Sequence, residues 1–529
     1  MTNRKSTKRA LLGSVMAMVL CLAMLVGATF AWFTDTASTG VNKIQAGKLD
    51  VALEMKEGDS WVSAEGKTLN WVKAAAGEQV LWEPGCTYTL PELRVVNNGN
   101  LALKYKIQIT GIQGDAKLNE VIDWTINDAA IDLTEGHLTA GQQGDAFTIK
   151  GHMKETAGND YQNLTIDGIG ITVYATQDTV ESDSFNNTYD ANAQYPAMPY
   201  VTSHEALNTN LTLADIPTNE ATGKHDPVEV ALGNTEAGDI AYSEHSSGYT
   251  GKGVMLGSTK LNSYAAAPAK AGEYTFVFKN GTINSAATGY SSIDNLKDTS
   301  VYMLVPGNSD VVFENMTFNG VVSFDIQMYT SPWSYLHSIT FKNCTFNGIV
   351  VGSCPAEKAT FDGCTFNNYT NTIYANNSNP IWWRAGTGYW GTGADESVHS
   401  LKEFTFVNNK VTSTRPVKIE RIGWNCTAGI TILDNTFDIS KQAGDSETKN
   451  MAINIGQKDN TSKFILTDDG NTISAGTASL YTAALGSGSN QYVAVSGSKV
   501  LDRNGNDKVI TAMVWKTTTG ETFDMKTID

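Results

Sequence analysis

The sequence predicts an all-β protein: an antiparallel β-sandwich, then a parallel β-helix and a C-terminal cap of strands. Three observations support this. Stretches with a helical period are missing beyond the N-terminus, charged residues make up only 18% of the chain, and a short phenylalanine-containing motif recurs through the C-terminal half. Because 529 residues exceed what one hydrophobic core organises, we expect two or three domains.

The charge balance and the cysteine content exclude several classes of protein. The formal net charge of -17 repels nucleic acid and anionic lipid and keeps an exported protein soluble, so no nucleic-acid partner is expected. Besides Cys21 in the apolar N-terminal segment, the chain has five cysteines: Cys86, Cys344, Cys354, Cys364 and Cys426. This number permits one disulfide but does not make a disulfide scaffold.

The N-terminus has the features of an export signal, assigned to residues 1–31. Four basic residues precede an apolar run that ends near Ala31. Ala31 at position -1 and the small Thr29 at position -3 predict cleavage between Ala31 and Trp32. The alternative is an uncleaved anchor, because about 20 apolar residues can span a bilayer. Either way, the bulk of the chain is expected outside the cell.

The residues around this cleavage site resemble those of a known family. The segments 30–36 (FAWFTDT) and 44–50 (IQAGKLD) look like the start of TasA/camelysin-type proteins. The resemblance covers about residues 10–180 and implies a dedicated signal peptidase, a jelly-roll sandwich and extracellular fibres of the biofilm matrix. Trp32 departs from the pattern, because a small residue is expected at the first mature position.

Residues 32–180 are expected to form the sandwich. Apolar and polar residues alternate over 49–55, the Asn-rich stretch 97–100 suits a hairpin, and 105–109 and 169–174 read as further strands. His137 and His152 lie in loop-like surroundings without a carboxylate at ligand spacing, so neither a metal nor a catalytic residue is assigned here. The resemblance implies that segment 32–46 adds as a strand to a second copy of the protein, unless it is the first strand of its own sheet.

Residues 181–204 read as a linker, and residues 205–490 carry the repeated motif. In each copy an apolar residue points inward, a polar bend follows, and a second apolar residue points inward. Asn280, Asn315 and Asn343 are placed at the bends as a ladder, because Asn accepts left-handed backbone. Phe341 and Phe361, 20 residues apart, are expected to stack on successive turns. The pattern resembles the right-handed β-helix of pectate-lyase-like proteins.

Cys344 and Cys364 occupy the same place in successive copies of the motif. They either form a disulfide between neighbouring turns or pack as a small buried ladder of thiols, and the ladder is the favoured interpretation.

Catalysis has to be considered, because proteins with a similar β-helix include polysaccharide lyases and glycosidases. The candidate groups on the expected turns do not gather into a recognisable constellation, so no catalytic residue is assigned: Asp362, Asp434, Lys418, Glu420 and Arg421. The Gly-rich insertion 376–400 is a stronger candidate, because its aromatic rings suit the faces of sugars. Its proposed glycan-binding residues are Trp382, Trp383, Arg384, Tyr389 and Trp390. The alternative is that these rings form a local core.

Residues 491–529 are expected to cap the last turn with strands. The stretch Asp502–Asp507 weakly suggests Ca²⁺, but an Asn-Gly hairpin explains it without a metal, and no other cofactor is implied. No sorting signal for the cell wall follows. The sequence thus predicts a secreted or cell-surface structural or adhesive protein of a Gram-positive-type bacterium. Its expected partners are the signal peptidase, copies of itself or related matrix proteins, and glycans. The alternative is a secreted polysaccharide lyase, glycosidase or glycan-binding protein.

Overall fold

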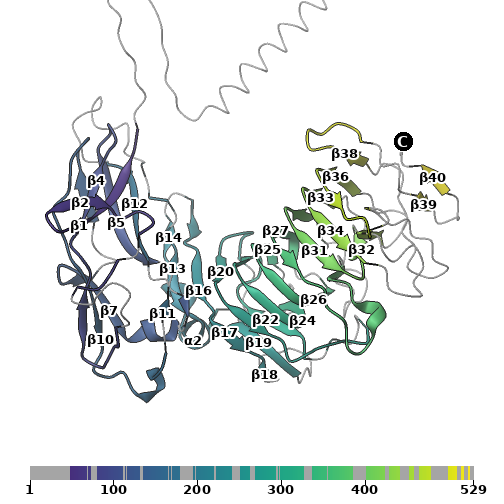
Figure 1. Cartoon of the computed structure of the whole chain (residues 1–529), viewed down its shortest axis with the longest axis horizontal. Coiled ribbons are helices and arrows are strands. Elements are labelled where there is room, and N and C mark those ends of the chain that lie inside the picture. Colours follow the sequence, from purple (N-terminus) through teal and green to yellow (C-terminus); the bar gives the residue numbers. More distant parts are fainter. Residues whose placement is uncertain are drawn as a thin grey trace, which may run out of the picture.

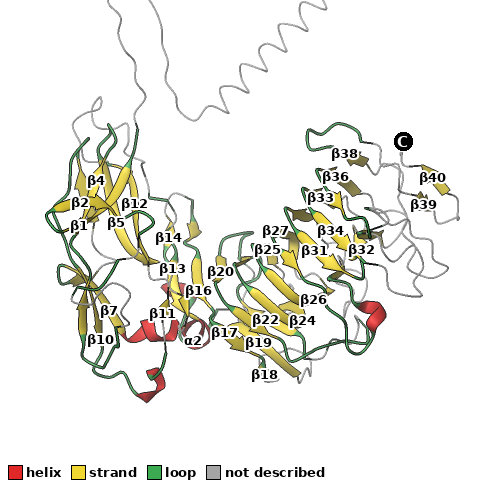
Figure 2. Cartoon of the chain, in the orientation of Figure 1, coloured by secondary structure: helices red, strands yellow, loops and turns green. Residues whose placement is uncertain are grey.

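The computed structural model describes residues 48–508 with internal gaps, the longest being 179–192, 241–250, 385–400, 441–451 and 481–498, together with the short strands at 514–516 and 522–524. The predicted cleavage site at Ala31 and Trp32 lies outside the described residues. Strands dominate the chain, so the all-β prediction is confirmed (Figures 1 and 2). Among the described residues, no helix has the length and apolar character needed to cross a membrane.

The N-terminal domain consists of antiparallel sheets that pack around a main hydrophobic core and a smaller second cluster. The strands, in order of pairing, are β2 (Ser60–Ser63), β1 (Val51–Glu57) and β4 (Leu93–Asn97); β3 (Thr87–Thr89), β10 (Ile149–Met153), β7 (Ile122–Ile126) and β8 (Ala129–Ala130); β12 (Gly170–Gln177), β5 (Leu103–Thr110) and β9 (Glu135–Leu138); and the pair β11 (Ile166–Asp167) and β6 (Gln113–Gly114). Alternation places Leu93, Val95, Ile107 and Ile149 inside, where each is at most 2% exposed.

The C-terminal domain is a parallel β-helix, called the coil below, whose first sheet has ten strands. They are β13 (Tyr200–Ser203), β16 (Val228–Ala231), β20 (Thr275–Lys279), β23 (Asp310–Glu314), β25 (Leu336–Lys342), β27 (Ala356–Asp362), β30 (Glu403–Val407), β33 (Ala428–Leu433), β36 (Phe464–Asp469) and β38 (Lys499–Leu501). All neighbours in this order pair in parallel. Strand β13 lies inside the range predicted as linker.

A second set of parallel strands follows the first sheet after one bend in each turn. It contains β17 (Asn234–Glu236), β21 (Thr282–Asn284), β24 (Thr317–Ile326), β26 (Thr345–Ser353), β28 (Thr365–Phe366), β31 (Lys410–Ser413), β34 (Thr436–Ile439) and β37 (Thr472–Ile473). The rest of each turn is completed by β18 (Gly238–Ile240), β19 (Gly251–Gly257), β22 (Ser300–Leu304), β29 (Ile381–Arg384), β32 (Val417–Ile422) and β35 (Ile453–Gln457), and by the ends of β24 and β26. Outside the coil sheets lie the pairs β14 (Thr218–Asn219) with β15 (Lys224–His225) and β39 (Val514–Lys516) with β40 (Thr522–Asp524).

The repeated motif stacks in register along the coil. Phe313, Phe341, Phe361 and Phe406 face one another on β23, β25, β27 and β30, and none has any exposed surface. Neighbouring ring centroids in this column lie 4.7–6.0 Å apart. The column therefore combines burial of large aromatic surface with favourable ring geometry.

Each bend between the first and second strands is made by one residue with left-handed backbone. Asn280, Asn315 and Asn343 have φ of 53°, 54° and 53°. Later turns use Gly363, Asn408, Asp434 and Gly470 at the same place, with φ between 56° and 67°. These are the residue types that reach this conformation at low cost, so the bend is encoded locally.

The first turn of the coil is covered and fixed to the sandwich. Helix α2 (His204–Thr209) begins with Ser203 as its N-cap and packs against β19. The hydroxyl of Ser203 also bonds to Glu120, which lies in η1 (Ala116–Val121) of the sandwich. Tyr195 contacts the sandwich through two residues. Its hydroxyl donates a hydrogen bond to Glu135 at 3.0 Å, and the ammonium of Lys106 lies 5.1 Å from the centroid of the Tyr195 ring. The segment before the coil is thus held against the first domain.

Candidate functional site

The predicted ladder residues lie on the outer side of the bend, and a second, buried ladder lies directly behind them. Asn315 Nδ2 donates to Asn280 Oδ1 at 3.3 Å, while Asn343 holds the bend of the next turn. The sequence analysis missed the buried ladder, which is formed by Asn409, Asn435 and Asn471. Its signal was an asparagine one residue after the bend in three successive turns.

The buried ladder saturates its amide groups. Asn435 has no exposed surface; its Nδ2 donates to the Phe406 carbonyl at 2.8 Å and to Asn471 Oδ1 at 2.9 Å. Its Oδ1 accepts from the backbone N–H of Asn409 at 2.9 Å. Inside a low-dielectric coil such a chain of hydrogen bonds fixes the register of successive turns.

Cys344 and Cys364 occupy the position of this ladder in the two preceding turns. Both are 1% exposed and neither forms a disulfide. Each thiol lies near a backbone carbonyl of the preceding turn, with Cys364 Sγ 3.3 Å from the Phe341 oxygen. Burial raises the pKa of the Cys364 thiol, so Cys364 is poorly suited to nucleophilic chemistry. Both buried side chains pack as small apolar groups.

Three of the five proposed glycan-binding residues lie on a strand, which corrects the loop predicted for them, while their binding of glycans stays a prediction. Trp382 and Trp383 lie on β29, which pairs with β26 and β32, so their side chains alternate. Trp383 points into the coil, is 3% exposed and meets Phe361 at 5.5 Å between ring centroids. Arg384 ends the strand, and Tyr389 and Trp390 lie outside the described residues.

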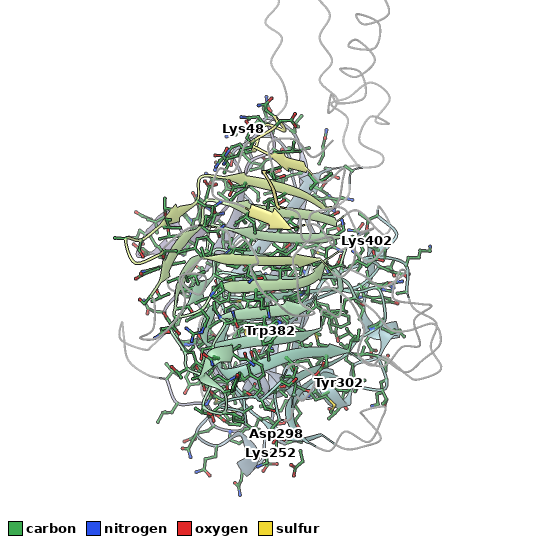
Figure 3. The ribbon with its side chains drawn as sticks, turned by 90° about the vertical axis from the view of Figure 1, so that its right-hand side faces the viewer. Lys48, Lys252, Asp298, Tyr302, Trp382 and Lys402 are labelled. Atoms are coloured by element: carbon green, nitrogen blue, oxygen red, sulfur yellow. The ribbon has the colours of Figure 1, made fainter. Side chains whose placement is uncertain are left out.

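Trp382 packs against a small core on the outer side of the coil. Figure 3 labels Trp382 among the stacked strands of the coil. Its ring lies 6.3 Å from that of Tyr290, and the ammonium of Lys418 lies 3.7 Å from the Trp382 ring centroid. Asn371, 1% exposed, receives a bond from the Tyr290 N–H at 3.0 Å and holds the loop that contains η6 (Ala375–Asn377) over this core. Trp382 therefore serves chiefly to pack two insertions onto the coil.

Charged side chains on the first sheet are paired between turns. Lys279 contacts Glu229 at 2.5 Å and Glu314 at 3.7 Å, and Lys342 contacts Glu314 at 3.3 Å. Asp362, named as a catalytic candidate, accepts from Asn408 at 3.1 Å. Each of these carboxylates already faces a cation or an amide. Glycosidases instead need two free carboxyl groups flanking the substrate.

The histidines of the sandwich lie on strands, contrary to the loop-like surroundings predicted for them. His137 on β9 has a carboxylate partner, with Nδ1 2.8 Å from Asp178 Oδ2, which corrects the prediction that it had none. His152 on β10 bonds to the Thr87 hydroxyl at 2.8 Å. Chain segments far apart in sequence bring His137 and Asp178 together, so spacing could not reveal the pair. Within the described ranges, no group of three or more His, Cys, Asp or Glu residues could hold a metal.

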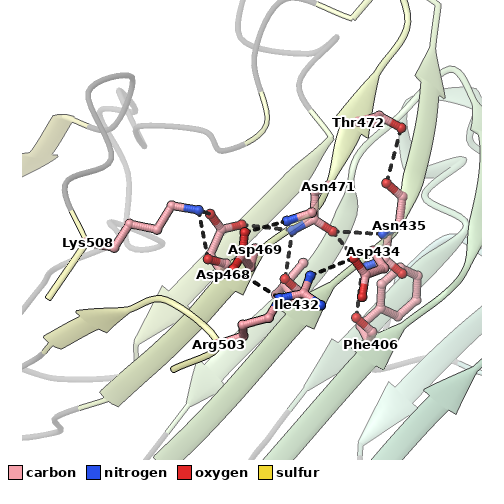
Figure 4. A network of polar contacts seen from close by, with 11 residues as sticks. Phe406, Ile432, Asp434, Asn435, Asp468, Asp469, Asn471, Thr472, Arg503 and Lys508 are labelled. Atoms are coloured by element: carbon pink, nitrogen blue, oxygen red, sulfur yellow. Dashed lines mark hydrogen bonds and ion pairs between the residues drawn. The ribbon is translucent and has the colours of Figure 1, made fainter. Parts of the chain in front are cut away.

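Acidic residues do gather at the C-terminal end of the coil, which the sequence analysis did not predict. Asp434, Asp468 and Asp469 lie on adjacent turns and face two cations from the segment after β38 (Figure 4). Arg503 contacts Asp434 at 2.7 Å and Asp469 at 3.1 Å, and Lys508 contacts Asp468 at 2.7 Å.

The electrostatics of this cluster differ from those of an acid–base pair. The guanidinium of Arg503 holds the pKa of Asp469 below its usual range, so this carboxyl stays ionised. A general acid requires the opposite shift. The arrangement can tie the terminal hairpin to the last turns, and the ionised Asp469 has no proton to give to a leaving oxygen.

The loop suspected of binding Ca²⁺ is closed by its own hydrogen bonds. Asp502 Oδ1 accepts from the backbone N–H groups of Asn504 and Asn506 at 2.9 and 2.8 Å, and its Oδ2 accepts from the Asn506 amide at 2.9 Å. These bonds hold the pKa of Asp502 below its usual range. The turn is thus organised by an Asx-type network.

The fold and these contacts define a two-domain all-β protein in which a sandwich carries a parallel coil. Residues 6–58 match the family model described as Camelysin metallo-endopeptidase, which supports the resemblance of the N-terminal part alone. A search of the curated proteins found no match. Among solved structures, the catalytic domain of a GH87 alpha-1,3-glucanase in complex with tetrasaccharides is similar at 8% identity, over 90% of this chain and 99% of that chain, with a TM-score of 0.11. A TM-score this low carries no argument.

Proposed function

We propose that the protein is an exported structural component of an extracellular matrix, in which the sandwich mediates assembly or attachment and the coil is a stiff displayed rod. The observation that carries this proposal is that polar side chains on the coil surface bond to their equivalents in the next turn. Asn367 donates to Asn347 at 2.7 Å, Asn347 to Asn319 at 3.0 Å, and Asn319 to Asn284 at 2.7 Å.

This outer ladder continues to Asn234, which accepts from Asn284 at 2.8 Å, so it links five turns. The charged column around Lys279 and the buried column around Asn435 also join neighbouring turns, and the buried column contributes most to stability because water cannot replace its bonds. Side chains that are engaged with one another stiffen a coil and are poorly placed to engage a reacting substrate. We therefore place the function in shape and mechanical stability.

Export and assembly are the parts of the proposal that rest on the N-terminal match. We place the mature start at Trp32, after removal of the leader by a signal peptidase, and the protein on the cell surface or in the biofilm matrix. Segment 32–46 would then add as a strand to a neighbouring copy, with affinity supplied by main-chain hydrogen bonds.

The test combines N-terminal sequencing of protein from the culture medium with electron microscopy. Fibres from the mature chain, and their loss after deletion of residues 32–46, would support strand addition. Unchanged fibres from the deletion variant would contradict it. The same preparation, assayed for reducing sugar and unsaturated uronate on a panel of glycans, should show no turnover. Turnover that disappears in an Asp434→Asn variant would replace this proposal with the enzymatic alternative.

A further inference from the structure

Asp468 occupies a position at which earlier turns place an aromatic ring. It pairs in register with Ile432, in the same inward column as Phe361 and Phe406, and it is 5% exposed. A carboxylate in an apolar column is costly unless its oxygens are fully engaged. The groups that engage it therefore decide what it does.

The two oxygens of Asp468 contact an amine and a primary amide from different parts of the chain (Figure 4). Lys508 Nζ lies 2.7 Å from Oδ2, and Asn471 Nδ2 lies 2.9 Å from Oδ1. One carboxylate is thus within proton-transfer distance of a potential nucleophile and of a potential leaving group.

The amide of Asn471 is held in a fixed orientation. Its Oδ1 accepts from the backbone N–H of Asn435 at 3.0 Å and from Asn435 Nδ2 at 2.9 Å. Its Nδ2 also donates to the carbonyl of Ile432 at 2.7 Å. Two donors on one carbonyl oxygen polarise the carbonyl group and stabilise negative charge that develops there, as in an oxyanion hole.

From this geometry we propose that Lys508 and Asn471 become joined by an intramolecular isopeptide bond, with Asp468 as the proton carrier. Asp468 takes a proton from Lys508, and the neutral Nζ swings on its flexible stem to attack Cγ of Asn471. The Nζ–Cγ bond forms, and Oδ1 carries the negative charge between the two donors of Asn435. The Cγ–Nδ2 bond then breaks as Asp468 returns the proton to the departing nitrogen. Asp468 next takes the second proton from Nζ, which leaves a neutral amide, and passes that proton to the released ammonia. One amide replaces another, ammonia is released, and no cofactor or oxidant is needed.

The bond would join the segment after β38 covalently to the last complete turn of the coil. No disulfide serves this purpose among the described cysteines, which are free. The inference concerns the chemistry of the chain itself, so it stands or falls independently of the proposed matrix function.

The test is the intact mass of the natively folded mature protein after denaturation, with its N-terminus fixed by sequencing. The expected mass is lower than that of the sequence by one ammonia, and tryptic mapping should recover a branched peptide that joins Lys508 to Asn471. Lys508→Arg keeps a cation beside Asp468 but cannot form the bond, so it should show the full mass. Asp468→Asn should slow formation of the bond about a hundredfold or more.

Circular dichroism must show that both variants are folded. Full mass in the folded natural protein overturns the proposal. A deficit of one water with a branch at Asp468 overturns the assignment of Asn471 as the acceptor. A bond that forms at an unchanged rate in Asp468→Asn overturns the role of Asp468.

Discussion

Asn435→Ala tests whether the buried ladder holds the turns of the coil in register. The substitution removes the acceptor of the Asn409 backbone N–H and a donor to the Phe406 carbonyl, both inside the coil. A buried polar group left without a partner costs about 1–3 kcal/mol, so two such groups predict a loss of about 2–6 kcal/mol.

The matched control is Asn347→Ala in the outer ladder. It removes two amide–amide bonds of similar length, at 3.0 and 2.7 Å, but on an exposed side chain where water replaces them. Its cost should stay within about 0.5 kcal/mol. Urea unfolding followed by tryptophan fluorescence compares the two midpoints. Equal shifts in the two variants would show that burial of the ladder contributes nothing, and the reasoning would be refuted.

Three further predictions concern titration and thiol chemistry. Burial lowers the pKa of His204, whose Nε2 lies 2.7 Å from the Met255 carbonyl oxygen, so stability should fall as pH drops below the unfolded value of 6.5. His204→Gln should reduce this pH dependence of the thermal midpoint, and an identical dependence in both proteins would contradict the prediction. Burial raises the pKa of Asp226, whose Oδ1 has no hydrogen-bond partner. Asp226→Asn should therefore raise the thermal midpoint at neutral pH, and the gain should fade as pH falls to the unfolded pKa of 3.8. A lower thermal midpoint of the variant at neutral pH would count against this prediction. Peptide mapping after alkylation should find Cys86 modified in the folded protein, and Cys344 and Cys364 only in denaturant; rapid native labelling of the buried pair would disprove their packing role.

The stacking of the coil was predictable because its information is local. A phenylalanine on each side of an Asn or Gly bend fixes both the inward faces and the left-handed residue, as Phe341 and Asn343 show. The same pattern also marked Cys344 and Cys364 as equivalent positions. The sequence similarly indicated the strands that became β1, β5 and β12.

The remaining sites depend on contacts that no local pattern encodes. Trp382 and Trp383 lie a few residues before a Gly-rich stretch, which suggested a loop, but neighbouring strands on both sides draw them into a sheet. Asp468 reads as an ordinary surface acid until its register with Ile432 places it inside. Its partner Lys508 comes from a later segment, so only the folded chain brings the pair together.

Both ends of the coil are covered, the first turn by α2 and the last turns by the terminal hairpin. The number of turns between these ends therefore sets the length of the coil. Each additional turn would lengthen it by about 4.8 Å, the spacing of neighbouring strands. Because a column of Phe rings and an outer column of Asn side chains run through the middle turns, a whole turn could be duplicated or removed there without disturbing either end. The distance between the sandwich and the far tip is thus set by the number of motif copies, and it can change in evolution one copy at a time.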